Sequence, residues 1–101
     1  MSCHQDKKEF LEYLQFQKHY SINTVESYQR SLNEFIDFLN QESINDFNNV
    51  TYQIMRRYLL YLNEKKLSKS SMNNRISCLR SFYKYLVKEE LAENNPMILV
   101  E

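Results

Sequence analysis

The spacing of apolar residues between positions 68 and 88 constrains the fold of this chain more than any other feature. These residues recur at steps of three and four, the repeat of one buried stripe on an α-helix. Ser68, just before the first turn, is a suitable N-cap. The sequence therefore predicts a helix over 68–88. Its expected stripe is Met72, Ile76, Leu79, Tyr83 and Leu86.

The opposite face of this predicted helix is basic and polar. From Lys65 to Lys88 there are seven Lys or Arg residues and no acidic residue. A solvated helix face usually mixes the two charges, because i,i+4 pairs stabilise it. Asn and Arg can bond bidentately to base edges, and Lys to phosphate, so this face favours a DNA major groove over a solvated face that is merely basic. Its members are Lys69, Ser70, Asn73, Asn74, Ser77, Arg80, Ser81, Lys84 and Lys88.

The charge of the chain is unevenly distributed. The net charge is zero, but residues 1–46 carry −4, residues 47–88 carry +8 and residues 89–101 carry −4. A concentrated basic patch matters more for binding an anionic partner than the total charge does. The distribution is thus compatible with double-stranded DNA as a partner.

Three more helices are expected from the same periodicity. One spans about 6–19, with Asp6 and Glu9 in capping-box spacing. A second begins after Ser21 and ends near Asn40, which could take the left-handed position there. A third follows Thr51 and runs from about Tyr52 to Lys65. The predicted core residues are Phe10, Leu11, Tyr13 and Leu14, then Ile22, Val25, Tyr28, Leu32, Phe35, Ile36 and Leu39, then Ile54, Met55, Tyr58, Leu59 and Leu62, with Phe47 anchoring the Asn-rich loop between.

The second predicted helix repeats the polar chemistry of the fourth in its first half. Its later turns carry Glu34 and Asp37, so only the first half suits a nearby phosphate backbone. The residues placed on that outer side are Asn23, Thr24, Ser27, Arg30 and Ser31.

Several classes of site are excluded. The chain of 101 residues has no glycine, which rules out P-loop, dinucleotide-binding and nucleophile-elbow motifs. Cys3 and Cys78 are in no metal or redox spacing, and His4 and His19 have no partner at ligand spacing, so no metal or cofactor is expected. Without a membrane-length apolar run or a secretory segment, a cytoplasmic protein with no membrane partner is expected.

The residues after Lys88 differ in charge and in pattern from the helix before them. Three acidic residues follow Lys88, and Asn94-Asn95-Pro96 ends helical structure. The short apolar segment after Pro96 has no accompanying pattern. We therefore expect one domain over 1–96 and the start of a linker over 97–101.

An ordered set of short motifs resembles a known family. It resembles the N-terminal core-binding domain of tyrosine recombinases, in particular the Xer-type and phage-integrase members, from about Phe10 to Pro96. The motifs are Tyr20-Ser21-Ile22-Asn23-Thr24 with Tyr28 and Leu32, Leu67-Ser68, Arg75-Ile76-Ser77, Leu79-Arg80-Ser81-Phe82-Tyr83 with Tyr85-Leu86, and Asn95-Pro96.

The resemblance implies an all-α fold, a compact orthogonal SAM-like bundle of four main helices that forms half of a clamp around DNA. Its second and fourth helices would face the major groove. The family often has Asp where this chain has Ser31, and Gly where it has Glu90. Catalysis belongs to a C-terminal domain that is absent from this chain, so no catalytic residue is expected here and every tyrosine is taken as structural.

The resemblance also implies partners. These are double-stranded DNA, the catalytic domain in the same polypeptide and other recombinase protomers on DNA, in DNA integration and recombination. Two alternatives remain: a helical protein–protein interaction module and a free-standing accessory DNA-binding factor. The predicted DNA-binding residues are Asn23, Thr24, Ser27, Arg30, Lys69, Ser70, Asn73, Asn74, Ser77, Arg80 and Lys84.

Overall fold

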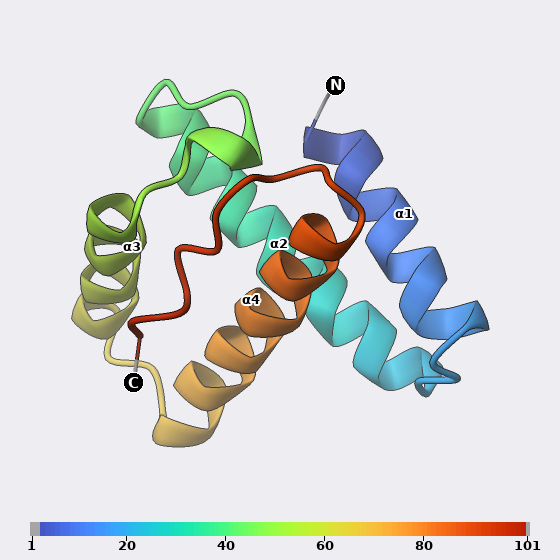
Figure 1. Cartoon of the computed structure of the whole chain (residues 1–101). Coiled ribbons are helices and arrows are strands. Elements are labelled where there is room, and N and C mark those ends of the chain that lie inside the picture. Colours follow the sequence, from blue (N-terminus) through green and yellow to red (C-terminus); the bar gives the residue numbers. More distant parts are fainter. Residues whose placement is uncertain (1–2, 101) are drawn as a thin grey trace. The chain divides into compact units, whose positions relative to one another are not determined.

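The computed structural model describes residues 3–100, and within them every regular element is a helix. The all-α prediction is therefore confirmed. The chain divides into two units, residues 1–46 and 47–101. The elements are α1 (Cys3–Phe16), α2 (Ile22–Gln41), the short 3₁₀ helix η1 (Phe47–Asn49), α3 (Tyr52–Glu64) and α4 (Lys69–Lys88) (Figure 1).

The beginnings of α2, α3 and α4 lie where the sequence predicted them. In each case a hydroxyl residue with extended backbone precedes the helix, and its side-chain oxygen accepts a hydrogen bond from a backbone N–H of the first turn. Such caps satisfy one of the donors that a helix start leaves open. The pairs are Thr24 N to Ser21 Oγ at 3.3 Å, Ile54 N to Thr51 Oγ1 at 3.2 Å and Ser71 N to Ser68 Oγ at 3.1 Å.

The prediction for the start of α1 is wrong. The helix begins at Cys3 and ends at Phe16, so Asp6 lies within it and is not its cap. Asp6 stands four residues before Phe10 and eight before Leu14, on the same face of the helix. All three side chains are buried. Because the helix already begins at Cys3, the Asp6 carboxyl group lies on its buried face and does not cap its first turn.

The ends of α2 and α4 use non-glycine residues in the left-handed conformation. Ser43 (φ 61°) holds this position after α2, so the prediction for Asn40, which is helical, is wrong. Glu90 (φ 61°) holds it after α4. In both cases the next residue, Ile44 or Leu91, donates its N–H at 2.8 Å to a carbonyl of the last helical turn. This is the Schellman arrangement, with an apolar residue following the left-handed one.

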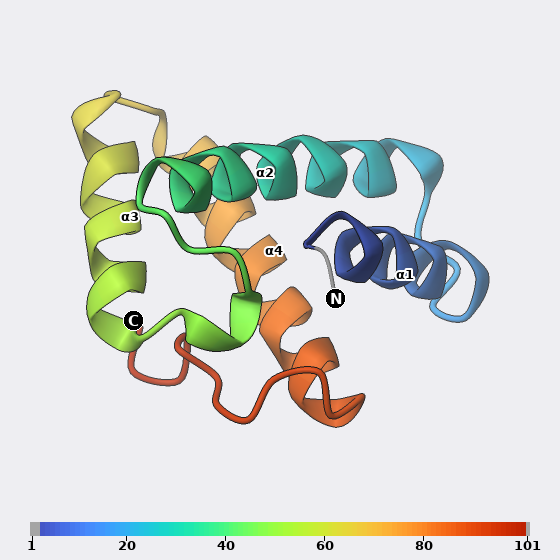
Figure 2. The same ribbon diagram turned by 90° about the horizontal axis from the view of Figure 1, so that it is seen from above.

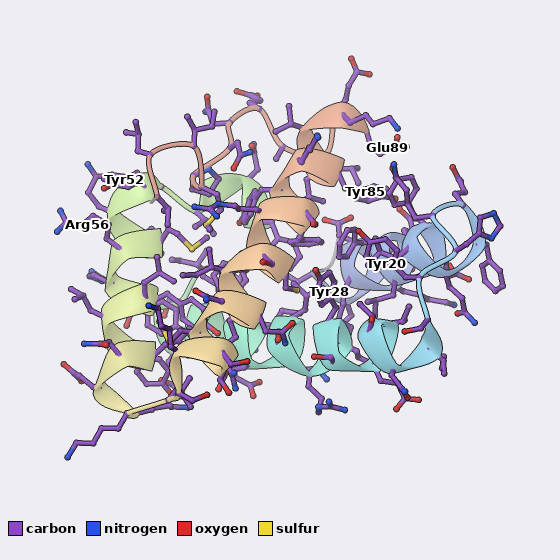
Figure 3. The ribbon with its side chains drawn as sticks, turned by 90° about the horizontal axis from the view of Figure 1, so that it is seen from below. Tyr20, Tyr28, Tyr52, Arg56, Tyr85 and Glu89 are labelled. Carbon is purple, nitrogen blue, oxygen red and sulfur yellow. The ribbon has the colours of Figure 1, made fainter. Side chains whose placement is uncertain are left out.

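The first unit is built from α1 and α2. These helices pack against each other and are joined by a short turn (Figure 2). Most of the predicted α2 stripe is buried, but Ile22, the first residue of the helix, is 54% exposed. Ser31, predicted on the outer side, is buried instead, because it lies on the same face of the helix as the buried residues Phe35 and Phe38, four and seven positions later. Tyr20 and Tyr28 make an edge-to-face pair at the start of α2, at 6.3 Å between ring centroids (Figure 3).

The second unit is organised around Phe47, which is buried as predicted. Its ring packs edge-to-face on Phe82 at 4.7 Å and on Tyr83 at 6.4 Å. The buried sector of α4 is wider than its predicted stripe, since Phe82, Cys78 and Tyr85 are buried beside Leu79 and Tyr83. A helix that buries two adjacent stripes exposes only a narrow face, which limits where α4 can meet a partner.

The segment after α4 folds back along the second unit. It leaves the end of α4 and returns to α3, as Figures 1 and 2 both show. The Glu93 N–H bonds to Asn48 Oδ1 at 2.8 Å, and Met97 is only 2% exposed. Of the predicted linker over 97–101, residue 101 lies outside the described residues. Residues 97–100 form a turn against the unit.

Candidate nucleic-acid interface

The outer face of α4 presents the polar residues that the sequence assigned to it. The Ser68 cap fixes the start of the helix, and the buried stripe fixes which side faces outward. Most of the predicted residues are exposed, and Asn74 and Ser81 are half-buried at the border. The exposed members are Lys69, Ser70, Asn73, Ser77, Arg80, Lys84 and Lys88.

This face is continuous along the helix and contains no acidic residue. Turning by about 100° per residue, Lys69, Asn73, Arg80 and Lys84 fall within one quarter of the helix circumference. Arg75 does not belong to it: that side chain is half-buried and its Nη1 donates to the Ser71 carbonyl at 3.3 Å. The α4 face thus brings exposed cationic side chains together with the exposed amide of Asn73.

One member of the α4 face has a partner that the sequence did not reveal. Arg80 Nη2 donates a 2.8 Å hydrogen bond to the Val100 carbonyl, twenty residues away. An open pocket beside this bond is lined by Arg80, Lys84, Asn95 and the returning segment. A sequence pattern can mark Arg80 as outward-facing, but it carries no signal for a backbone partner at this distance.

The predicted residues on α2 are only partly available. Asn23 and Arg30 are exposed, whereas Thr24 and Ser27 are half-buried. The Thr24 hydroxyl lies 3.0 Å from Ser21 Oγ, so it belongs to the helix cap. Since Ser31 is also buried, the polar face of α2 in the first unit is smaller than predicted.

Several nucleophilic side chains of α2, α3 and α4 are withdrawn from solvent. Tyr28, Tyr58 and Tyr83 are buried, and Tyr83 is bonded to a backbone carbonyl at 3.0 Å. Burial raises the pKa of the Cys78 thiol to about 12, so it stays protonated and unreactive. Among residues 3–100, no three His, Cys, Asp or Glu side chains are grouped so that they could hold a metal ion.

Comparison with known proteins assigns the family. The model of the phage integrase N-terminal SAM-like domain matches residues 8–90. The chain belongs to this family.

The relatives of this integrase domain are longer proteins. The chain is 46% identical over 93 residues to the tyrosine recombinase XerC of Bacillus subtilis, covering 92% of this chain and 31% of that protein. It is 43% identical over 91 residues to XerC of Bacillus pumilus, covering 90% and 30%. The chain thus spans about a third of the length of these relatives.

A solved structure supports the fold. The N-terminal domain of a phage integrase/site-specific recombinase from Haloarcula marismortui superimposes with a TM-score of 0.88 at 16% identity, covering 100% of this chain and 97% of that one. The SAM-like helical fold is therefore shared although few residues are. None of the helices within residues 3–100 has the length and apolarity needed to cross a membrane.

The structure shows how the turn after α4 accommodates a residue other than glycine. Glu90 stands where the resemblance expects Gly, and its φ of 61° is one that glycine adopts without strain. The turn after α4 therefore keeps its geometry, but the left-handed backbone of Glu90 costs conformational energy that glycine would not. The other departure, Ser31, lies in the buried sector of α2, away from the outer face.

Proposed function

We propose that this chain is the DNA-binding N-terminal part of a site-specific tyrosine recombinase, with α2 and α4 facing the major groove. The observation that carries the proposal is the exposed, acid-free face of α4. Neutralising several phosphates with Lys and Arg releases counterions and supplies most of nonspecific affinity. The family assignment and the XerC relatives support the same conclusion.

The residues of the α4 face divide by chemistry. Lys69, Lys84 and Lys88 are point charges suited to phosphate, whereas Asn73 and Asn74 carry amides suited to adenine edges. The exposed residues of α2, Asn23 and Arg30, add a second contact region. Phosphate contacts would fix the register of the protein, and the amides would supply sequence reading.

The chemistry of recombination is assigned to a catalytic domain elsewhere in the same polypeptide, with further protomers on DNA and the whole acting in the cytoplasm. Under this proposal, the present chain binds DNA without cleaving it. A suicide DNA substrate that traps covalent protein–DNA intermediates provides the test. The chain should give no adduct, and a stable adduct would refute this division of labour.

The binding proposal itself is tested by titrating the isotopically labelled chain with duplex DNA at several salt concentrations. Isolated binding should be weak, about 10⁻⁴ to 10⁻⁶ M as in nonspecific complexes. Amide shifts should concentrate in residues 23–31 and 69–84 and shrink as salt rises. Shifts confined to α1 and the acidic segment after α4, or no shifts at low salt, would overturn the proposal.

A protein-interaction module is the second candidate, favoured by one observation. Leu60 and Leu99, which are 57% and 66% exposed, line an open pocket with Tyr52 and Arg56 in the second unit. Exposed apolar side chains beside an Arg and a Tyr are common at protein interfaces. If DNA causes no shifts while Leu60→Asp abolishes capture of a protein partner, this second function would be the better account.

A further inference from the structure

The segment that follows α4 is itself folded. The Met97 N–H bonds to Asn95 Oδ1 at 2.9 Å, the Ile98 N–H to the Asn95 carbonyl at 3.3 Å, and the Val100 N–H to the Met97 carbonyl at 3.1 Å. Met97 is buried. We call residues 95–100 the strap. Its internal hydrogen bonds and its buried anchor hold its backbone in place beside α4.

The strap meets α4 at the basic face. Val100 accepts the 2.8 Å hydrogen bond from Arg80 Nη2 through its backbone carbonyl. An open pocket of about 440 Å³ is lined by Arg80 and Lys84 of α4 and by the strap residues Asn95, Met97, Ile98 and Val100. The cationic wall of this pocket comes from α4 and the opposite wall from the strap.

Arg80 remains available to a ligand despite its bond to the strap. A guanidinium has five N–H donors in a fixed planar fork, and one bond to a neutral carbonyl leaves the others free. Arg80 and Lys84 are both exposed, so the strap does not cover them. The contact therefore holds the guanidinium in one place without consuming its binding capacity.

We propose that the strap and α4 together form a phosphate-binding pocket for one phosphodiester of the DNA backbone, in which Val100 positions Arg80. Arg80 and Lys84 would supply two cationic donors to the same phosphate. The conformational entropy of the Arg80 side chain is then already lost in the free protein, so DNA binding does not have to order it. This inference rests on the proposed DNA binding, and it assigns Arg80 to the backbone instead of a base edge.

The location of Arg80 on α4 supports this assignment. Ile76, four residues earlier on the predicted apolar stripe, is half-buried and adjoins Arg80 on the helix surface, whereas Asn73 and Ser77 are nearer the middle of the exposed face. A helix lying in the major groove is flanked by phosphate backbones. A side chain at its border, turned toward the strap, is suited to those phosphates.

The test loosens the strap without changing charge. Ile98 and Leu99 are 75% and 66% exposed, so replacing both with Gly removes little packing but frees the backbone. Ile98→Ala with Leu99→Ala is the matched control, since it removes nearly the same side-chain atoms and keeps the backbone stiffer. Thermal melting establishes that both variants fold.

The glycine variant should bind duplex DNA about two- to tenfold more weakly than the alanine variant, because Arg80 must then be ordered on binding. In an Arg80→Ala background the two strap variants should bind equally, since the strap acts through that side chain. Arg80→Ala alone should weaken binding to all duplexes alike and lower the salt slope by about one.

The possible outcomes distinguish failure of this inference from failure of the proposed DNA binding. If the unaltered chain binds no DNA, the proposed function fails. If it binds but the glycine variant binds as well as the alanine variant, or better, the strap does not position Arg80 and only the inference fails. An Arg80→Ala loss confined to one base-pair position would also refute the phosphate assignment.

Discussion

The Tyr83 hydroxyl donates a 3.0 Å hydrogen bond to the Phe47 backbone carbonyl, in the interior of the second unit. Both side chains are fully buried, and their rings also meet edge-to-face. The bond joins the second half of α4 to η1, the 3₁₀ helix that begins this unit. It also gives this buried tyrosine a structural role.

Removing that hydroxyl should destabilise the protein. Tyr83→Phe leaves the Phe47 carbonyl buried without its donor, which should cost about 1–3 kcal/mol in the free energy of unfolding. Tyr52→Phe, at a half-buried position of α3, is the control. Denaturant unfolding measures both, and equal midpoints would show that the bond contributes nothing.

Truncating the central residue of the α4 stripe should cost more. Leu79 is 1% exposed, so Leu79→Ala should reduce stability by about 2–5 kcal/mol through lost burial and the cavity left behind. Leu60→Ala, at a position 57% exposed, should change stability by less than about 0.5 kcal/mol. An unchanged melting midpoint for Leu79→Ala would contradict the assigned core.

The left-handed residue after α4 predicts a stabilising substitution. Glu90→Gly should raise stability by about 0.5–1 kcal/mol, since a left-handed conformation costs an L-residue about 1–2 kcal/mol and glycine loses part of this gain to chain entropy. Glu89→Gly, one residue earlier at φ −87°, should give no gain. Thermal melting compares the two, and a less stable Glu90→Gly protein would refute the strain.

The buried carboxyl of α1 predicts a pH-dependent effect. Burial, followed by the charges of Glu9 and Asp46, raises the pKa of Asp6, and its Oδ1 has no hydrogen-bond partner. The folded state therefore binds the proton more tightly than the unfolded state. Stability should be highest below the unfolded pKa and decrease as the pH rises through the folded pKa.

Asp6→Asn should accordingly raise the melting temperature near neutral pH, with the gain shrinking toward about pH 3, where the carboxyl is protonated in both states. Glu12→Gln, an exposed position on the same helix, controls for the loss of one negative charge. A gain that is independent of pH would show that ionisation of Asp6 is not its source.

The two kinds of DNA contact proposed for α4 should be separable. Lys84→Ala should weaken binding to every duplex and lower the salt slope by about one, whereas Asn73→Ala should cost about 1–3 kcal/mol at one base-pair position if it reads a base. Lys8→Ala, an exposed lysine of α1, is the control. If Lys84→Ala and Lys8→Ala reduce affinity equally, net charge and not the α4 face determines binding.

Local sequence determined the helices and the outer face of α4. Ser21, Thr51 and Ser68 cap their helices as predicted, and a cap depends only on residues within one turn. The apolar stripe around Leu79 then fixes which side of α4 is outward. The ends of α2 and α4 could also have been predicted from local sequence, because Ile44 and Leu91 supply the apolar residue that follows a left-handed one.

Only the tertiary structure decided which polar side chains are exposed to solvent. Asp6 and Ser31 look like surface residues, yet both are buried, because burial depends on the surfaces that pack over a helix. The bond between Arg80 and Val100 spans twenty residues and uses a backbone carbonyl, which every residue has. No side-chain pattern can encode such a partner, so the path of the strap had to come from the packing of the whole unit.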